Sequence, residues 1–232
     1  MSRNAILRMA VDLAMTVLLL LLMGYSLVGE TAHEWLGIGM LALFVVHHVL
    51  NRRWLAGLLR GRYSPARSLR TVLAGLLLLT MLGSAVSGVL LSKHIFRFSA
   101  LGGAWFARTL HMLCGYWNFV LMSLHLGVHW VTILGRVGKR LPKGNPALTW
   151  AARAAAALIA AYGVYALITR QIGRYLLGLT AFAMFDGSQP LVWFLLDYLA
   201  VMGLFVGLGH NLSKCLNRNR PGRNEQKGEK TS

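Results

Sequence analysis

Two pairs of histidines lie within hydrophobic sequence at the same spacing. His33 and His47 are fourteen residues apart, and so are His111 and His125. In an α-helix, fourteen residues amount to four turns less roughly 40°, so both members of a pair share one face. They are separated by roughly 21 Å along the axis, one toward each side of a bilayer core about 30 Å thick. Two such helices can hold two haems, with each iron bound by one histidine from each helix.

The composition indicates that most of the chain lies in lipid. Of its 232 residues, 56% are hydrophobic and 13% are charged, and the mean hydropathy is +0.56. A soluble domain carries about 25% charged residues. The net charge of +17 would suggest nucleic acid as the partner of a soluble protein, but here the basic residues cluster between apolar runs, as membrane anchors do. We therefore expect contact with membrane lipid and no nucleic-acid partner.

Six apolar segments are each long enough to cross a bilayer as a helix. They span residues 6–28, 34–57, 69–92, 109–134, 150–168 and 190–212. The first has an apolar core too long for a signal peptide, and no small-residue cleavage site follows it, so we expect it to be retained. These segments predict an all-α, polytopic membrane bundle. It comprises a four-helix haem-binding core (1–135), two accessory transmembrane helices (136–213) and a basic, disordered cytoplasmic tail (214–232).

The distribution of Lys and Arg predicts the topology. Nineteen lie on one side: six in 51–70, five in 136–153, six from Lys214 onward, and Arg3 and Arg8. Five lie on the other side. By the positive-inside rule, both termini are cytoplasmic. The second and fourth spans then run in the same direction, so the first histidine of each pair lies near the outer face and the second nearer the inner face.

Other interpretations of these histidines are weaker. A single membrane histidine often only bonds to a neighbouring helix, but ionisable residues inside spans are costly and usually functional. Two equal spacings at matching depths favour ligands. A zinc or copper site needs three or four ligands within a few ångströms, whereas these histidines divide into two distant levels. We therefore expect His33 and His111 to bind one iron, and His47 and His125 the other.

Two further histidines complicate the inner level. His48 adjoins His47, and His129 lies one turn beyond His125 on the same face. Either could be the true ligand after a small rotation of its helix. Either could instead donate a hydrogen bond to a haem propionate or to a quinone.

Three arginines lie where the anionic propionates would meet cations. Arg108 precedes His111 by one turn, while Arg52 and Arg53 follow His47 by about one turn. A cation at these positions would form charge-assisted hydrogen bonds with a propionate. The same arginines are equally expected as interfacial anchors of the helices.

A few other residues bear on the bundle core. Gly75 and Gly88 are thirteen residues apart and offer room for a flat macrocycle. Asn118 lies midway between the histidines of its segment, where a helix–helix hydrogen bond is favoured over a link between the two haem levels. Asp197 could carry protons, and a pairing with a neighbouring polar group is at least as well supported.

The segment HEWLGIGMLALFVVHHVLNRRW (His33 to Trp54) resembles the signature of the flavinylation-associated cytochrome domain. It is also similar to the cytochrome b membrane subunits of bacterial hydrogenases and formate dehydrogenases. The segments RYSPARSLRTVLAGLLLLTMLGSAVSGVLLSKHIF and ARTLHMLCGYWNFVLMSLHLGVHW extend the resemblance, which covers roughly residues 6–135. It rests on the patterns HEWxG…HxxxNRxW and Hx13HxxxH.

The resemblance implies a function. In such families the matching histidines, here His33, His47, His111 and His125, ligate two haems b. It implies electron transfer across the bacterial cytoplasmic membrane, often to an extracytosolic flavin-carrying protein, with the chain as the electron-transfer component of an oxidoreductase system. A quinone is a further candidate partner. Two alternatives stay open: a one-sided membrane reductase acting on quinone or ferric iron, and a transporter without haem.

Overall fold

The computed structural model describes residues 3–58, 60–96, 104–137, 146–182 and 189–218. All regular secondary structure in these residues is α-helical, and six helices are long and apolar enough to cross a membrane. The predicted all-α, multi-pass membrane architecture is confirmed. The six helices are α1 (Arg3–Met23), α3 (Glu30–Leu50), α5 (Pro65–Leu91), α6 (Ala104–Val137), α7 (Pro146–Thr169) and α9 (Leu191–Arg218). The short helices are α2 (Tyr25–Val28), α4 (Arg52–Ala56) and α8 (Ile172–Leu176).

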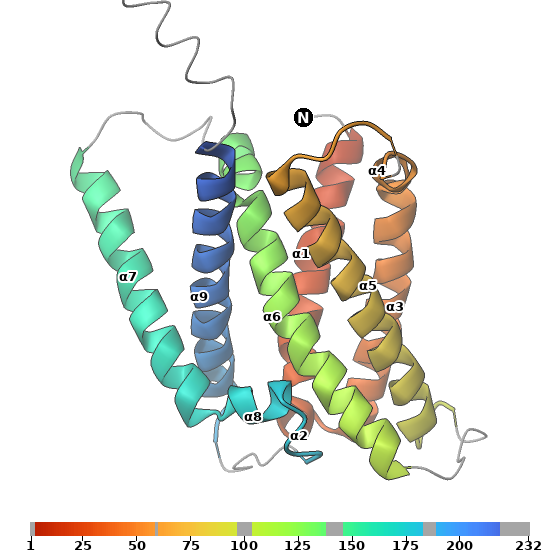
Figure 1. Cartoon of the computed structure of the whole chain (residues 1–232). Helices are drawn as coiled ribbons and strands as arrows, with labels where there is room; N and C mark the ends of the chain where they lie inside the picture. Colours follow the sequence, from red (N-terminus) through yellow and green to blue (C-terminus); the bar gives the residue numbers. More distant parts are fainter. Residues whose placement is uncertain (1–2, 59, 97–103, 138–145, 183–188, 219–232) are drawn as a thin grey trace, which may run out of the picture.

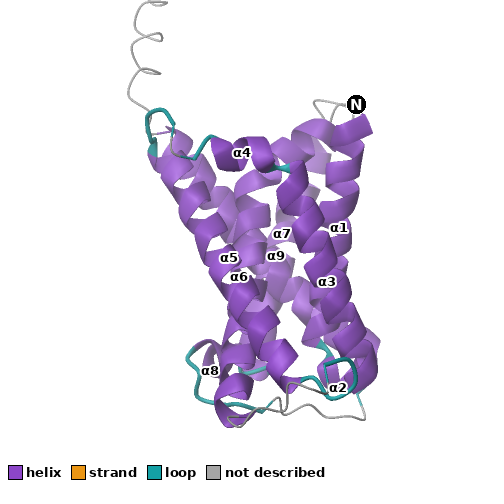
Figure 2. Ribbon diagram, turned by 90° about the vertical axis from the view of Figure 1, so that its right-hand side faces the viewer, coloured by secondary structure: helices purple, strands orange, loops and turns teal. Residues whose placement is uncertain are grey.

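The long helices run alternately up and down the bundle. Helix α1 begins, and α9 ends, at the end of the bundle that carries α4, here called the α4 end; α2 and α8 lie at the opposite, α8 end (Figures 1 and 2). The two ends of the described chain therefore lie on the same side, as predicted. The side that faces the cytoplasm stays a prediction, and residues 219–232 of the predicted tail lie outside the described part of the chain.

Local sequence signals determine several helix boundaries. Ser64 precedes α5 and its hydroxyl accepts from the Arg67 backbone N–H at 3.4 Å, while Pro65 occupies the first turn, where no N–H is needed. The predicted spans 6–28 and 34–57 are too long. The first is interrupted at Gly24, and the second at Asn51, whose side-chain amide donates to the His47 carbonyl at 2.9 Å and ends α3. The Asn51 side chain therefore competes with the backbone N–H groups of the helix for a carbonyl oxygen.

Helix α6 lies at the centre of the packing. It packs closely against α5 on one side and α9 on the other, α7 packs on α9, and α3 packs mainly on α1. The close approach of α6 and α9 depends on Gly127 and Gly209, because a Cβ at either would collide with the facing backbone. The largest fully buried side chains of the described core include Phe119 of α6 and Tyr198 of α9. Helices α3 and α6 make little direct backbone contact.

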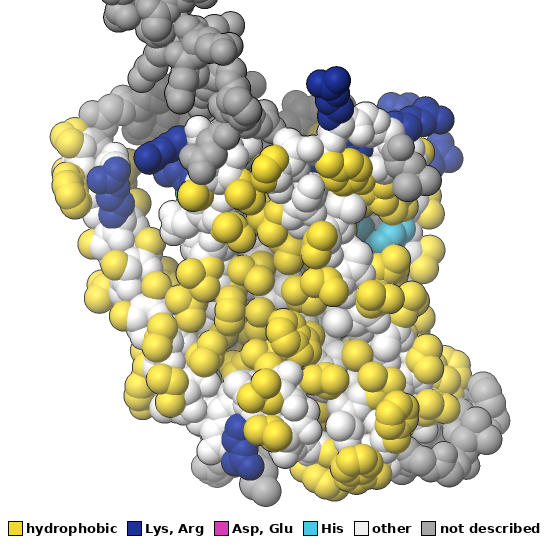
Figure 3. Space-filling model, viewed as in Figure 1, with side chains coloured by type: hydrophobic (Ala, Val, Ile, Leu, Met, Phe, Trp, Pro, Cys, Tyr) yellow, Lys and Arg dark blue, Asp and Glu magenta, His cyan; other side chains and the backbone are white. Residues whose placement is uncertain are grey.

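The outer surface fits a lipid environment. On the face shown in Figure 3, apolar side chains cover the middle of the bundle, and Lys and Arg side chains lie toward its ends, mostly at the α4 end. Large apolar side chains such as Leu79, Leu158 and Val192 are each about two-thirds exposed. In water such a surface would be unfavourable, whereas lipid solvates it.

Candidate cofactor site

The structure brings His33 and His111 together near the α8 end. The centroids of their imidazole rings are 6.0 Å apart, and the ring planes are inclined at 69°. The two residues come from α3 and α6, which otherwise make little direct contact. The two histidines that were predicted to pair at the outer level are therefore neighbours in space.

Contacts with α5 hold the His111 ring in one orientation. Its Nδ1 lies 3.1 Å from the Ser84 carbonyl oxygen and 3.1 Å from Ser87 Oγ. A carbonyl only accepts, and the Ser87 hydroxyl already donates to the Gly83 carbonyl, so His111 Nδ1 carries the proton. Gly88 lets the ring approach, because a Cβ there would lie 3.4 Å from His111 Cε1. The other ring nitrogen, Nε2, is left unprotonated and able to bind a metal.

His33 is placed by the turn between α1 and α3. Gly29 adopts φ +89°, a conformation that L side chains rarely adopt, and α3 begins at the next residue. One turn later, the His33 ring meets Tyr25 edge-on, with centroids 5.1 Å apart. Its Nδ1 is buried and has no hydrogen-bond partner among the described residues. A buried nitrogen without a partner is costly in a protein alone, and a group bonded to Nδ1 itself would remove that cost.

Open space lies beside both histidines of this pair. Gly37 follows His33 by one helical turn, and Gly115 follows His111 by one turn, so each glycine shares the face of its histidine. A Cβ at either glycine would meet nothing within 4 Å. Gly75, predicted to offer such room, is also open, whereas Gly88 packs against the His111 ring.

Charged groups surround this level at the α8 end. Lys93 contacts Glu30 at 2.7 Å, and this bond raises the pKa of the Lys93 ammonium. Burial, with Glu30 nearby, raises the pKa of the Tyr25 phenol, so its hydroxyl keeps its proton. Arg108 lies over the Phe182 ring at 4.6 Å and is close enough to Tyr25 and Lys93 to act on them electrostatically. The positive charge predicted for a propionate is thus present at this level.

The second level, toward the α4 end, is built differently. His47 Nδ1 lies 2.8 Å from Asp12 Oδ1 of α1, and because a carboxylate only accepts, the imidazole donates. His125 interacts electrostatically with His47 and Asp12, yet no ring contact joins His47 to His125 among the described residues. His125 Nδ1 is buried without a hydrogen-bond partner in the described part of the chain. The two histidines share a neighbourhood but are not in contact.

The two extra histidines, His48 and His129, each contact a residue one turn back on the same helix. His48 Nδ1 donates to the Phe44 carbonyl at 2.8 Å, one turn back on α3. The His129 ring lies 4.7 Å from the His125 ring. Both are therefore close to the second level, and the structure leaves both as alternative ligands to their neighbours.

The arginines at this end differ in their placement. Arg52 and Arg53 lie on α4, are exposed, and follow the end of α3. Arg8 of α1 lies one turn before Asp12, and its Nε is buried with no hydrogen-bond partner in the described structure. Arg8 was not predicted as a site residue, although a partly buried guanidinium suits a propionate better than an exposed one.

A group of three possible metal ligands lies at the α8 end and is already engaged. One ligand atom each of Glu30, Glu34 and His94 falls within 4.8 Å of the others. Glu34, however, accepts from the Ser92 hydroxyl at 2.7 Å and from three backbone N–H groups of residues 93–95, so it ties the loop after α5 to α3. Glu30 binds Lys93. The group is a structural clamp.

The two polar residues singled out in the spans are also paired. Asn118 accepts from Thr80 at 2.5 Å and donates to Ser84 Oγ at 3.2 Å, so it forms the favoured helix–helix hydrogen bond. Asp197 binds Arg170 through two bonds, at 2.8 and 2.6 Å.

Sequence reasoning missed the groups that orient the histidines. Asp12 was the one available signal, because it is an acidic residue within the first apolar segment. The Ser84 carbonyl gives no sequence signal. Comparisons of the chain with protein-family models, curated proteins and solved structures find no match.

Proposed function

We propose that the protein is a di-haem b-type cytochrome that carries electrons across the bacterial cytoplasmic membrane to an extracytosolic, flavin-bearing redox partner. In this proposal both termini are cytoplasmic and the α8 end faces outward. The observation that carries it is the apposition of His33 and His111 from two separate helices.

The distance between these rings suits a shared metal ion. Two metal–nitrogen bonds of about 2 Å, together with the half-widths of two imidazole rings, place the ring centroids roughly 6 Å apart. The observed separation is 6.0 Å. The open faces at Gly37 and Gly115 provide room beside both rings for a flat macrocycle.

The donor sets at the two levels follow one pattern. At each level one histidine has its Nδ1 held by a protein acceptor: His111 by the Ser84 carbonyl, His47 by Asp12. The other, His33 or His125, has a buried Nδ1 without a partner among the described residues. Second-shell acceptors of this kind set the tautomer and basicity of metal-binding histidines. His47 rather than His48 is the proposed ligand, because His47 and its partner Asp12 lie close enough to His125 to act on it electrostatically.

Haem, when bound, supplies a one-electron couple at each level, and the chain controls its surroundings. Asp12 and the Ser84 carbonyl hold the ligand rings in orientation. Arg108 at the α8 end and Arg8 at the α4 end supply cations for propionates. The apolar side chains of α1, α6 and α9 keep water from the centre of the bundle.

The test is haem content in histidine variants. The purified protein should show a low-spin b-type reduced-minus-oxidised spectrum with two haems per chain. His111→Ala should lose about half the haem, while His94→Ala, which removes an exposed histidine outside both levels, should lose none. Full haem retention in His111→Ala would reject the ligand assignment.

A second measurement tests transfer across the membrane. Protein in proteoliposomes loaded with reductant should reduce an external flavoprotein. Haem reduction without any transfer to the outside would contradict the proposal and favour the one-sided reductase, and absence of haem would favour the transporter.

A further inference from the structure

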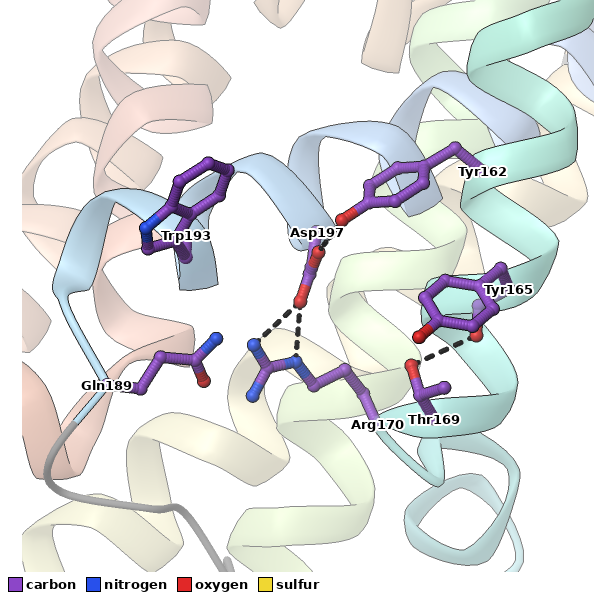
Figure 4. Close-up of a pocket in the computed structure, with 7 residues that line it drawn as sticks. All are labelled: Tyr162, Tyr165, Thr169, Arg170, Gln189, Trp193 and Asp197. Carbon is purple, nitrogen blue, oxygen red and sulfur yellow. Dashed lines mark hydrogen bonds and ion pairs between the residues drawn. The ribbon is translucent and has the colours of Figure 1, made fainter.

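A polar cleft lies between α7 and α9 near the α8 end, away from the histidine pairs. Its volume is about 360 Å³, within the range of small-molecule sites. Figure 4 shows the residues that line it. They are Tyr162, Tyr165, Thr169, Arg170, Gln189, Trp193 and Asp197.

An ion pair forms the polar centre of the cleft. Arg170 donates to Asp197 Oδ2 through Nε and Nη2, at 2.8 and 2.6 Å, and Tyr162 donates to Asp197 Oδ1 at 2.6 Å. The Arg170 and Asp197 side chains are only 16% and 14% exposed. Two of the three guanidinium nitrogens are thus used, and the guanidinium faces the Gln189 amide across the cleft (Figure 4). The site combines hydrogen-bond donors and acceptors without net charge.

Exposed aromatic rings form the rim. Tyr162, Tyr165 and Trp193 are 43%, 60% and 58% exposed and lie on helices whose outer faces are apolar. The cleft therefore opens sideways, toward the lipid around the bundle. A ligand that enters from lipid can place a flat ring against Trp193 and leave an apolar tail outside.

Because the ion pair has no net charge, the cleft favours a neutral head group of a lipid-soluble molecule over a charged one. A phosphate that accepts from the remaining Arg170 nitrogen would lie beside the Asp197 carboxylate and be repelled by it. A hydroxyl group on a neutral ring can instead donate to Asp197, and a carbonyl or hydroxyl oxygen of the ring can accept from Gln189 or Arg170, without breaking the pair.

Packed aromatic rings connect the cleft to α6. Arg170 lies over the Phe194 ring at 5.6 Å, Phe194 stacks on Tyr198 at 4.3 Å, and the Tyr198 hydroxyl lies 3.1 Å from that of Tyr116. Tyr116 lies on α6, between His111 and His125. A chain of contacts through Phe194 and Tyr198 thus links the cleft to the helix that carries two of the proposed haem ligands.

We propose that this cleft binds the head group of a membrane quinol or quinone. The binding claim rests on the cleft alone, while the preference for a redox-active ring rests on the proposed cytochrome function.

The experiment is photolabelling of the full chain in nanodiscs of zwitterionic phospholipid, with a short-chain azidoquinone as the probe. Labels mapped by mass spectrometry should fall on residues 162–170 and 189–197. Trp193→Leu removes an exposed ring and should weaken binding of the unlabelled competitor quinone about threefold to tenfold. The matched control is Trp150→Leu, at the other end of α7, which should leave binding unchanged.

Haem content measured in the same samples separates the two proposals. Quinone labelling of the cleft in a protein without haem supports this site and refutes only the cytochrome. Two haems with no label in the cleft refute only the quinone site. The site is also overturned if Trp193→Leu and Trp150→Leu behave alike, or if phosphatidylglycerol in the nanodisc abolishes labelling, which would make the cleft a phospholipid site.

Discussion

Replacing Asp12 by asparagine should raise the reduction potential of the haem proposed for the second level. In the structure, His47 donates to Asp12 at 2.8 Å. A carboxylate there stabilises the more positive ferric state. Asparagine keeps an acceptor oxygen in the same place, so the orientation of the ring is retained and only the negative charge is lost.

The size of the effect follows from the position of the charge. The Asp12 carboxylate is separated from an iron bound by His47 by the observed hydrogen bond, the imidazole ring and one metal–nitrogen bond, which together span about 7 Å. At this distance two unit charges interact with about 2.4 kcal/mol at an effective dielectric constant of about 20. For a one-electron couple this is about 100 mV. The Asp12 side chain is 50% exposed, so its surroundings screen part of the charge. We expect an upward shift of about 50 to 100 mV.

The assay is an optical redox titration of the purified protein, fitted with two components. One component should shift, and the other should move by no more than about a third as much, because the two levels are roughly 21 Å apart along the helices. Glu30→Gln, which removes an acidic group at the opposite end, should leave the second-level component in place. An unchanged or lowered potential in Asp12→Asn, or equal shifts of both components, would refute the assignment of His47.

Three further predictions test the rest of the structure. Gly115→Val should fill the open space beside His111 and lose about half the haem, and its melting temperature should fall no further than that of His111→Ala. Gly127→Val should lower the melting temperature by more, because the added side chain collides with the α9 backbone. Retention of both haems in Gly115→Val would argue against a macrocycle there. Asn118→Leu removes two interhelical hydrogen bonds and should destabilise the protein by about 1 kcal/mol in a denaturation assay while both haems remain bound. A phosphatase fused at Ser232 should be inactive and a cytoplasmic reporter active; the reverse result would invert the topology.

The sequence predicted the architecture because the local composition of a segment determines whether it can lie in a lipid bilayer. Each span must satisfy its own backbone hydrogen bonds and present apolar side chains to lipid, so hydropathy alone locates the six helices. The equal spacings of the histidines also predicted correctly that His33 and His111 lie at one level. Helix ends were less accurate: the break at Asn51 arises from one side-chain bond to a carbonyl, which hydropathy does not report.

Helical periodicity determined which face of each helix carries the histidines, but only the tertiary structure decided what those faces meet. It placed Asp12 against His47, the Ser84 carbonyl against His111, and Arg170 against Asp197. Each of these contacts joins residues that lie at least 27 positions apart in the chain. Which helix approaches which, and how closely, depends on packing between segments far apart in the chain, including the small residues that let α6 and α9 touch. No local pattern encodes that choice.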